Sequence, residues 1–148
     1  MDKPCVLLVD DNEATCTLVT AVLQRDYTID VANDGTEALE KLKTGKYAAI
    51  ILDLLMPPPD GYEILDVLVQ TRPEMLKRTV VLTAALSPRE KQRMKDYPVA
   101  DVIAKPFDVE VLLAAVKKCA GTEGPGLGNV LSSATLLFIA EMIQRRWM

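Results

Sequence analysis

Cys5-Val6-Leu7-Leu8-Val9-Asp10-Asp11 is the stretch that decides the fold, because an uninterrupted apolar run leads directly into two carboxylates. A short, continuous apolar run is typical of a strand buried on both faces of a parallel sheet. Charged side chains are not expected inside such a strand, so the strand should end where the carboxylates begin. The stretch therefore predicts a buried parallel strand with Asp10 and Asp11 at its carboxyl end.

Three further apolar runs end in the same way. They are Ile50-Ile51-Leu52 before Asp53, Val80-Val81-Leu82 before Thr83, and Val102-Ile103-Ala104 before Lys105. Ligands of open α/β sheets bind outside the carboxyl ends of the strands. We therefore expect Asp10, Asp11, Asp53, Thr83 and Lys105 to meet in one crevice.

Helical patterns alternate with these strands. Helices are expected at about 13–24, 34–42, 62–69, 87–97 and 108–119, and a more exposed strand at 27–32. The predicted inward faces are Ala14, Leu18, Ala21 and Val22 in the first helix and Val111, Leu112, Ala115 and Val116 in the last. Five strand–helix alternations predict an α/β fold of (βα)5 type, flavodoxin-like and doubly wound, with a five-stranded parallel sheet in the order 2-1-3-4-5.

The domain is expected to cover residues 1–120. Residues 121–128 are rich in glycine and indicate a linker, and residues 129–148 indicate an amphipathic helical tail. The tail could fold back on its own domain, which is the favoured alternative, pair with another protomer or a partner's groove, or lie on a membrane. Two arginines are a weak signal for a membrane surface.

Composition narrows the function. The 148 residues carry a net charge of -4 and no histidine, which excludes His-based catalysis and most zinc or haem sites. Mild acidity argues against direct nucleic-acid binding. Three widely separated cysteines without a C-x-x-C pattern indicate a reducing compartment. With no signal-peptide pattern and no apolar run of roughly 18 residues, we expect a cytoplasmic protein rather than a membrane protein.

The strand-end residues fit phosphoryl chemistry. Crowded carboxylates repel one another unless a cation holds them, and hard oxygen ligands suit Mg²⁺. Asp53 could act as a nucleophile on phosphorus, Lys105 could neutralise the phosphoryl charge, and Thr83 could donate a hydrogen bond. The backbone carbonyl of Leu55 could complete the metal shell. Each residue alone also has a plain structural role; Asp10-Asp11-Asn12, for example, could simply cap the first helix.

These motifs resemble the receiver domain of bacterial two-component response regulators, of the stand-alone kind similar to chemotaxis regulators. The resemblance covers about residues 4–120 and depends on Val9-Asp10-Asp11, the run from Asp53 to Gly61, Thr83-Ala84 and Lys105-Pro106-Phe107. It implies that Asp53 is the phosphoacceptor. It also implies that Asp10, Asp11, Asp53 and the Leu55 carbonyl bind Mg²⁺, and that Thr83 and Lys105 contact the phosphoryl group.

The resemblance also implies partners. The phosphoryl donor would be a histidine kinase or a phosphotransfer protein, and phosphorylation would change binding of a downstream protein through the last helices. A homodimer through the tail or the last helices stays open. The bond before Pro106 is often cis in this family. We expect a signalling module that catalyses only its own phosphorylation and dephosphorylation.

Three positions depart from the family pattern. Many receivers carry an aromatic residue where this chain has Val102, so signalling is expected to rely on Thr83, its loop and the following helix. That helix is mostly charged, with Met94 as nearly its only apolar anchor. Leu55 and Ala85 are apolar where relatives often carry groups that assist water. This pair predicts a long-lived phosphoaspartate.

Two alternative functions follow from the same residues. One is a Mg²⁺-dependent phosphohydrolase that works through an aspartyl phosphate. Its first strand would normally end in Asp-x-Asp, whereas this chain has Asp10-Asp11-Asn12. The other is a pseudo-receiver that binds partners without phosphorylation, and the complete set of key residues argues against it.

Overall fold

The computed structural model describes residues 3–84 and 86–120. Ala85, the predicted linker 121–128 and the predicted tail helix 129–148 lie outside the described residues. The elements are, in order, β1 (Cys5–Val9), α1 (Glu13–Leu23), β2 (Thr28–Ala32), α2 (Gly35–Thr44), β3 (Ala49–Leu52), α3 (Gly61–Thr71), the 3₁₀ helix η1 (Pro73–Arg78), β4 (Thr79–Thr83), α4 (Pro88–Met94), β5 (Asp101–Ala104) and α5 (Val109–Ala120).

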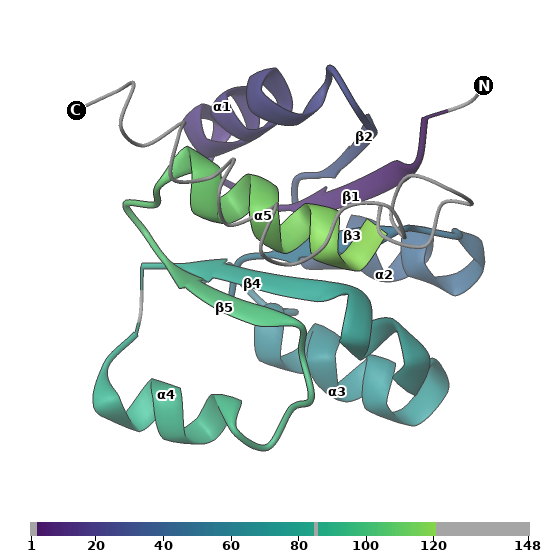
Figure 1. Ribbon diagram of the computed structural model, residues 1–148. Coiled ribbons are helices and arrows are strands. Elements are labelled where there is room, and N and C mark those ends of the chain that lie inside the picture. The colour runs from purple at the N-terminus through teal and green to yellow at the C-terminus, as the bar shows by residue number, and fades with distance from the viewer. Residues whose placement is uncertain (1–2, 85, 121–148) are drawn as a thin grey trace.

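All neighbouring strands pair in parallel, and the sheet has the order β2-β1-β3-β4-β5 (Figure 1). The predicted fold is therefore confirmed. In β1, β3 and β4 every residue except Cys5 is buried, as a sheet covered on both faces requires.

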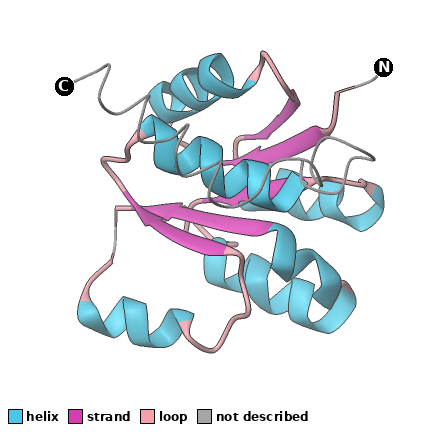
Figure 2. Cartoon of the chain, viewed as in Figure 1, coloured by secondary structure: helices cyan, strands magenta, loops and turns pink. Residues whose placement is uncertain are grey.

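Alternating strand residues supply two separate cores. Leu7 and Val9 of β1 pack with α2 and α3, whereas Val6 and Leu8 pack with α1 and α5. Figure 2 shows the helices as layers on the two sides of the sheet. Because apolar cores cover both faces of the sheet, its carboxyl edge is where polar side chains can gather.

The predicted inward faces of α1 and α5 were partly wrong. The buried residues of α1 are Cys16, Val19 and Leu23, while Ala14, Leu18 and Ala21 are exposed. Apolar residues occur around most of α1, so the sequence pattern is compatible with more than one buried face for this helix. In α5, Leu112, Ala115 and Val116 are buried as predicted, but Val111 is 46% exposed. One helical position turns a side chain by about 100°, which takes Val111 off the buried face.

The short helix η1 was not predicted. Its Pro73 occupies the first helical turn, where proline is favoured, although proline also marks the end of the preceding helix. Met75 and Leu76 of η1 are buried in the core with α3. Among the described residues, no helix has the length and apolar character needed to cross a bilayer.

Candidate functional site

The register of the sheet brings the strand-end residues together. Val9 pairs with Leu52, so Asp10 and Asp53 leave the sheet side by side. The backbone N–H of Asp53 donates to the Val9 carbonyl at 3.0 Å. On the other side, Thr83 pairs with Ala104, and the N–H of Lys105 donates to the Thr83 carbonyl at 2.9 Å.

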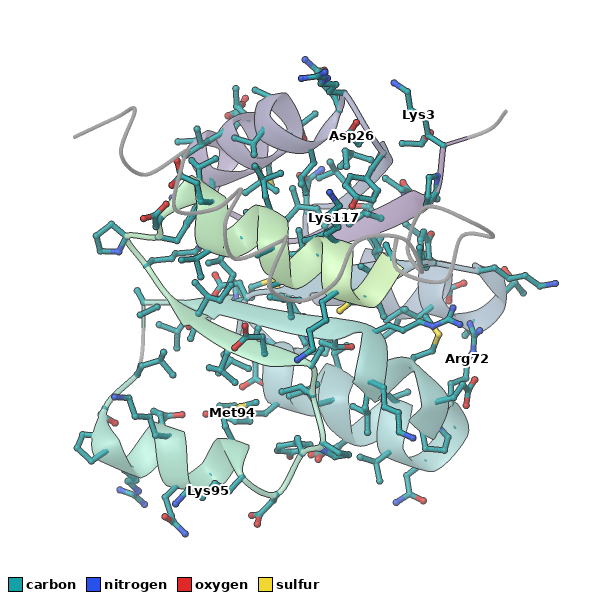
Figure 3. The ribbon with its side chains drawn as sticks, in the orientation of Figure 1. Lys3, Asp26, Arg72, Met94, Lys95 and Lys117 are labelled. Carbon is teal, nitrogen blue, oxygen red and sulfur yellow. The ribbon has the colours of Figure 1, made fainter. Side chains whose placement is uncertain are left out.

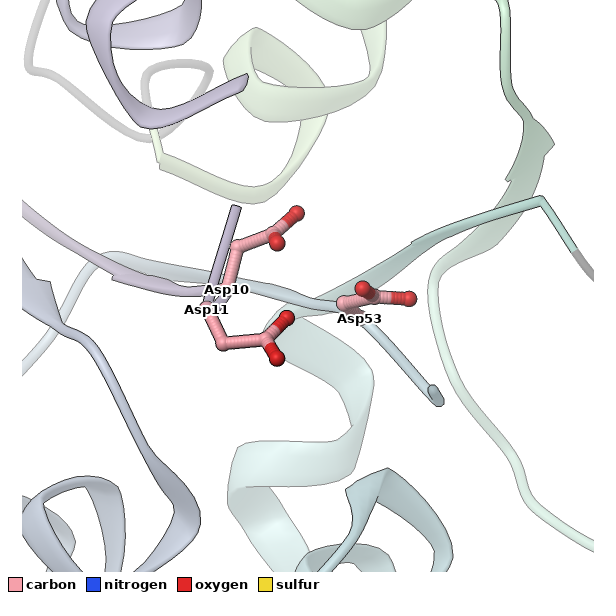
Figure 4. Close-up of side chains that lie close together, drawn as sticks. All are labelled: Asp10, Asp11 and Asp53. Atoms are coloured by element: carbon pink, nitrogen blue, oxygen red, sulfur yellow. The ribbon is translucent and has the colours of Figure 1, made fainter. Parts of the chain in front are cut away.

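Three carboxylates form a cluster at this edge (Figure 4). One oxygen from each of Asp10, Asp11 and Asp53 lies within 4.8 Å of the others. Asp10 and Asp53 are 1% and 6% exposed, whereas Asp11 is exposed. Buried charges require close partners, because desolvation is costly. The partners of the two buried carboxylates therefore define the site.

The ammonium of Lys105 is the main partner. Its Nζ lies 2.7 Å from Asp10 Oδ2 and 3.5 Å from Asp53 Oδ2. Burial alone would lower the pKa of Lys105, but the hydrogen bond to Asp10 and the charges of Asp53 and Asp10 outweigh it and raise the pKa above its usual value. Lys105 therefore stays cationic beside both carboxylates.

Asp53 is desolvated and held by several donors. Its Oδ1 accepts a hydrogen bond from the Leu55 N–H at 3.1 Å, and the Thr83 hydroxyl bonds its side chain. Burial, and then the charge of Asp10, raises the pKa of Asp53 above its usual range. The Leu55 N–H, Lys105 and Thr83 oppose that rise, so the carboxylate is stabilised mainly by groups that a phosphoryl oxygen could also use.

Asn12 and Cys16 belong to the surroundings of Asp10. The sequence indicated Asn12 only as part of a possible cap of the first helix, and it did not indicate Cys16. The Asn12 N–H donates to Asp10 Oδ1 at 2.8 Å, and the Cys16 thiol donates to the Asp10 carbonyl at 3.4 Å. Asn12 is also the N-cap of α1, since its Oδ1 accepts from the Thr15 N–H. Asn12 alone caps the helix, so Asp10 and Asp11 are not needed as caps. The N-cap preference of asparagine was the available signal.

Gly61 anchors the backbone behind Asp53. Its N–H donates to the Leu54 carbonyl at 3.2 Å, and a Cβ at this position would lie 2.5 Å from both the Asp53 carbonyl oxygen and the Leu54 Cα. Only glycine fits so close an approach. The Leu55 side chain is 55% exposed. The Lys105–Pro106 peptide bond is cis, as the resemblance implied.

The donor set fits a hard divalent cation. Three carboxylates face one ammonium, so the cluster keeps a net negative charge. Its ligating atoms are oxygens, which Mg²⁺ prefers, and the exposed Asp11 leaves the site open to water. The Leu55 carbonyl as a further ligand stays a prediction.

Comparisons with known proteins agree with this geometry. The family model of the response regulator receiver domain matches residues 6–117. The response regulator ArlR of Staphylococcus epidermidis is 34% identical over 113 residues, covering 76% of this chain and 50% of ArlR. The receiver domain of the Francisella response regulator 1452 has a TM-score of 0.72 at 27% identity, covering 79% of this chain and 96% of that chain.

A third match is the chemotaxis protein CheY4 of Vibrio cholerae. It has a TM-score of 0.69 at 32% identity, covering 79% of this chain and 98% of that protein. This chain spans about half the length of the curated regulators that it matches first. The family match, by contrast, covers most of the chain, including all five strands except Cys5 of β1 and the site at the strand ends. The chain therefore belongs to the response regulator receiver domain family.

Proposed function

We propose that this chain is a phosphorylation-controlled signalling module that accepts a phosphoryl group on Asp53. The observation that carries the proposal is the setting of Asp53: a buried strand-end carboxylate beside Asp10, Asp11 and the Lys105 ammonium. The donor would be a histidine kinase or a phosphotransfer protein. Phosphorylation would then change the binding of a downstream protein through α4 and α5.

In the proposed step an Asp53 carboxylate oxygen attacks phosphorus as the bond from phosphorus to the donor nitrogen breaks. The leaving imidazole takes the electron pair of that bond, and no proton has to leave Asp53. A general base is therefore unnecessary, in keeping with a chain that lacks histidine. Lys105 and the Thr83 hydroxyl would stabilise charge on the phosphoryl oxygens.

Asp10, Asp11, Asp53 and the Leu55 carbonyl would hold Mg²⁺ in this site. The bound ion would supply charge neutralisation for the carboxylates and the phosphoryl oxygens. The Lys105 ammonium already pairs with both Asp10 and Asp53 and so offsets part of their charge. The chain would modify only itself, without turning over other phosphoesters.

Intact-mass measurement after incubation with acetyl phosphate and Mg²⁺ tests the proposal. The wild-type chain should gain one phosphoryl group, and Asp53→Ala should gain none. Asp26→Ala is a matched control, because Asp26 is an exposed acid in the loop between α1 and β2, at the opposite edge of the sheet (Figure 3). Removal of Mg²⁺ with a chelator should abolish labelling. A wild-type chain that takes no phosphoryl group from acetyl phosphate or from a purified phosphorylated kinase would contradict the proposal.

We also expect the phosphoaspartate to be long-lived. The exposed Leu55 side chain offers no hydrogen-bonding group to align a hydrolytic water, and Ala85, the second apolar position of this prediction, lies outside the described residues. Leu55→Asn should therefore shorten the lifetime of the label severalfold. Decay in the purified wild type as fast as in Leu55→Asn would show that Leu55 does not set the lifetime.

A further inference from the structure

Helix α4 is joined to α3 by a set of polar and aromatic contacts. The Tyr62 hydroxyl donates to a Glu90 carboxylate oxygen, and the Arg93 guanidinium lies 3.6 Å from the centroid of the Tyr62 ring. Tyr97, just after α4, donates to Asp66 Oδ1 at 2.5 Å, and its ring centroid lies 6.3 Å from that of Tyr62. We call these five residues the α3–α4 clasp.

The clasp stabilises α4, a helix that buries little apolar surface in the described structure. Met94 is the only buried residue of α4 in the described structure, and it extends from the helix toward the sheet (Figure 3). Tyr62 is 6% exposed, so its hydroxyl needs the hydrogen bond to Glu90. Glu90 and Arg93 are three residues apart and share one face of α4, so both meet the same tyrosine.

Gly61, the residue before Tyr62, packs against the backbone of the candidate phosphoacceptor Asp53. Gly61 has no free space against the Asp53 and Leu54 backbone, where an added Cβ would lie at 2.5 Å. The Asp60 side chain caps the first turn of α3 by accepting from the Glu63 N–H at 2.9 Å. A shift of the Asp53–Leu54 backbone must therefore displace the first turn of α3, and with it Tyr62.

Val102 offers no comparable connection. Its aliphatic side chain is half-buried and packs against the same core cluster as Tyr97 and Val99, on the α3 side of the sheet. Its side chain has no polar group that could form or break a hydrogen bond if Thr83 moved. Tyr62, by contrast, contacts α4 both through a hydrogen bond to Glu90 and through the Arg93 guanidinium over its ring.

We propose that the α3–α4 clasp couples the state of Asp53 to the position of α4, with Tyr62 as the connecting residue. This inference rests on the proposed function, because it takes phosphorylation of Asp53 as the event that moves the backbone. Glu90 and Arg93 fix α4 in two ways at once, through a hydrogen bond to the Tyr62 hydroxyl and a cation over its ring. Rotation or translation of α4 would have to break both.

Hydrogen exchange of the whole chain without any phosphoryl donor tests the clasp itself. Tyr62→Phe removes only the hydroxyl, and Arg93→Gln removes only the cation. Each should make the amides of residues 89–96 exchange severalfold faster. Arg89→Gln is the matched control, because Arg89 is an exposed arginine of the same helix outside the clasp. Equal exchange in the wild type and both clasp variants would overturn the proposal.

The same measurement with Mg²⁺ and acetyl phosphate tests the coupling, with phosphoryl incorporation followed in parallel by intact mass. The wild type should change its exchange in residues 89–96 on phosphorylation. Tyr62→Phe and Tyr62→Leu should take the phosphoryl group to the wild-type extent and lose that change. A full response in both Tyr62 variants, or a phosphorylated wild type whose α4 does not respond, would overturn the coupling alone. A wild type that takes no phosphoryl group would instead overturn the proposed function, and the coupling with it.

Discussion

Helices α5 and α4 each follow a strand that ends at the site, but they are held by different forces. α5 buries Leu112, Ala115 and Val116 in the core that it shares with α1 and the sheet. α4 buries only Met94 among its described residues and depends on the α3–α4 clasp. Apolar burial contributes free energy in proportion to area, whereas polar contacts made by exposed groups such as Arg93 contribute little. The difference indicates a rigid support on one side of the site and a movable helix on the other.

Each helix follows one of the strand-end residues. Lys105 leads through Pro106 and Phe107 into α5, and Thr83 leads through a short loop into α4. Phe107 packs with the α1–α5 core. Lys105, the cation of the site, is therefore followed by the well-packed helix α5, whereas Thr83 is followed by the weakly packed helix α4. A signal that starts at Asp53 should meet least resistance toward α4.

The largest expected effect is on the α5 side. Leu112→Ala should lower the free energy of unfolding by about 2–5 kcal/mol, because it removes a fully buried side chain and leaves a cavity. Urea denaturation followed by circular dichroism measures this. The neighbouring Val111→Ala is the control, and its 46% exposure predicts a change within roughly 0.5 kcal/mol. Equal losses in the two variants would mean that the assigned buried face of α5 is wrong.

Met94→Ala should have a smaller effect on global stability. We expect about 2 kcal/mol, the lower end for this change, because the loosely held α4 can relax into the space. Hydrogen exchange should rise first in residues 89–96, before global unfolding. If the whole domain lost protection together, α4 would not be a separate weak unit and the contrast with α5 would fail.

Ser87→Ala should cost about 1 kcal/mol, the usual loss for an N-cap. The Ser87 hydroxyl accepts from the Glu90 N–H at 3.2 Å, and Glu90 is also part of the clasp. The effect should therefore be confined to the amides of α4, as measured by hydrogen exchange. Asp34→Ala, which removes the corresponding cap of α2, gives the comparison in a better-packed helix. Similar exchange changes in α2 and α4 would argue against a special weakness of α4.

The smallest expected effect is a pH dependence at Tyr97. Burial, followed by the hydrogen bond to Asp66, raises the pKa of Tyr97 from its usual 10.0 to about 12. A raised pKa means that the neutral phenol stabilises the folded state below pH 10, and that this contribution is lost as the pH rises toward 12. Burial also raises the pKa of Tyr27 and of Tyr47, so near-ultraviolet difference spectra should show several tyrosines titrating late, one of which is Tyr97. Tyr97→Phe should remove one tyrosine's amplitude from that late titration, whereas an unchanged titration would contradict the assignment.

Much of the fold was predictable because apolar runs and helix caps are local signals. Strands β4 and β5 contain the two predicted apolar runs that precede Thr83 and Lys105. Asp34 and Ser87, where two of the helices were predicted to begin, are the N-caps of α2 and α4. The inward face of α1 was not predictable, since apolar residues surround much of that helix and only its neighbours select Cys16, Val19 and Leu23. The clasp was equally hidden, because Tyr62 and Glu90 are far apart in the sequence and meet only when α3 and α4 pack.

The sequence by itself determined which chemistry the strand ends carry. Buried parallel strands must end where polar residues begin, so Asp10, Asp53, Thr83 and Lys105 could be placed at one edge from the residue order alone. Only the tertiary structure decided how these groups share charge and which helix they can move. Register sets Lys105 against Asp10 and Asp53, and packing sets Tyr62 between Asp53 and α4. Both depend on contacts between segments distant in the chain, which no local pattern encodes.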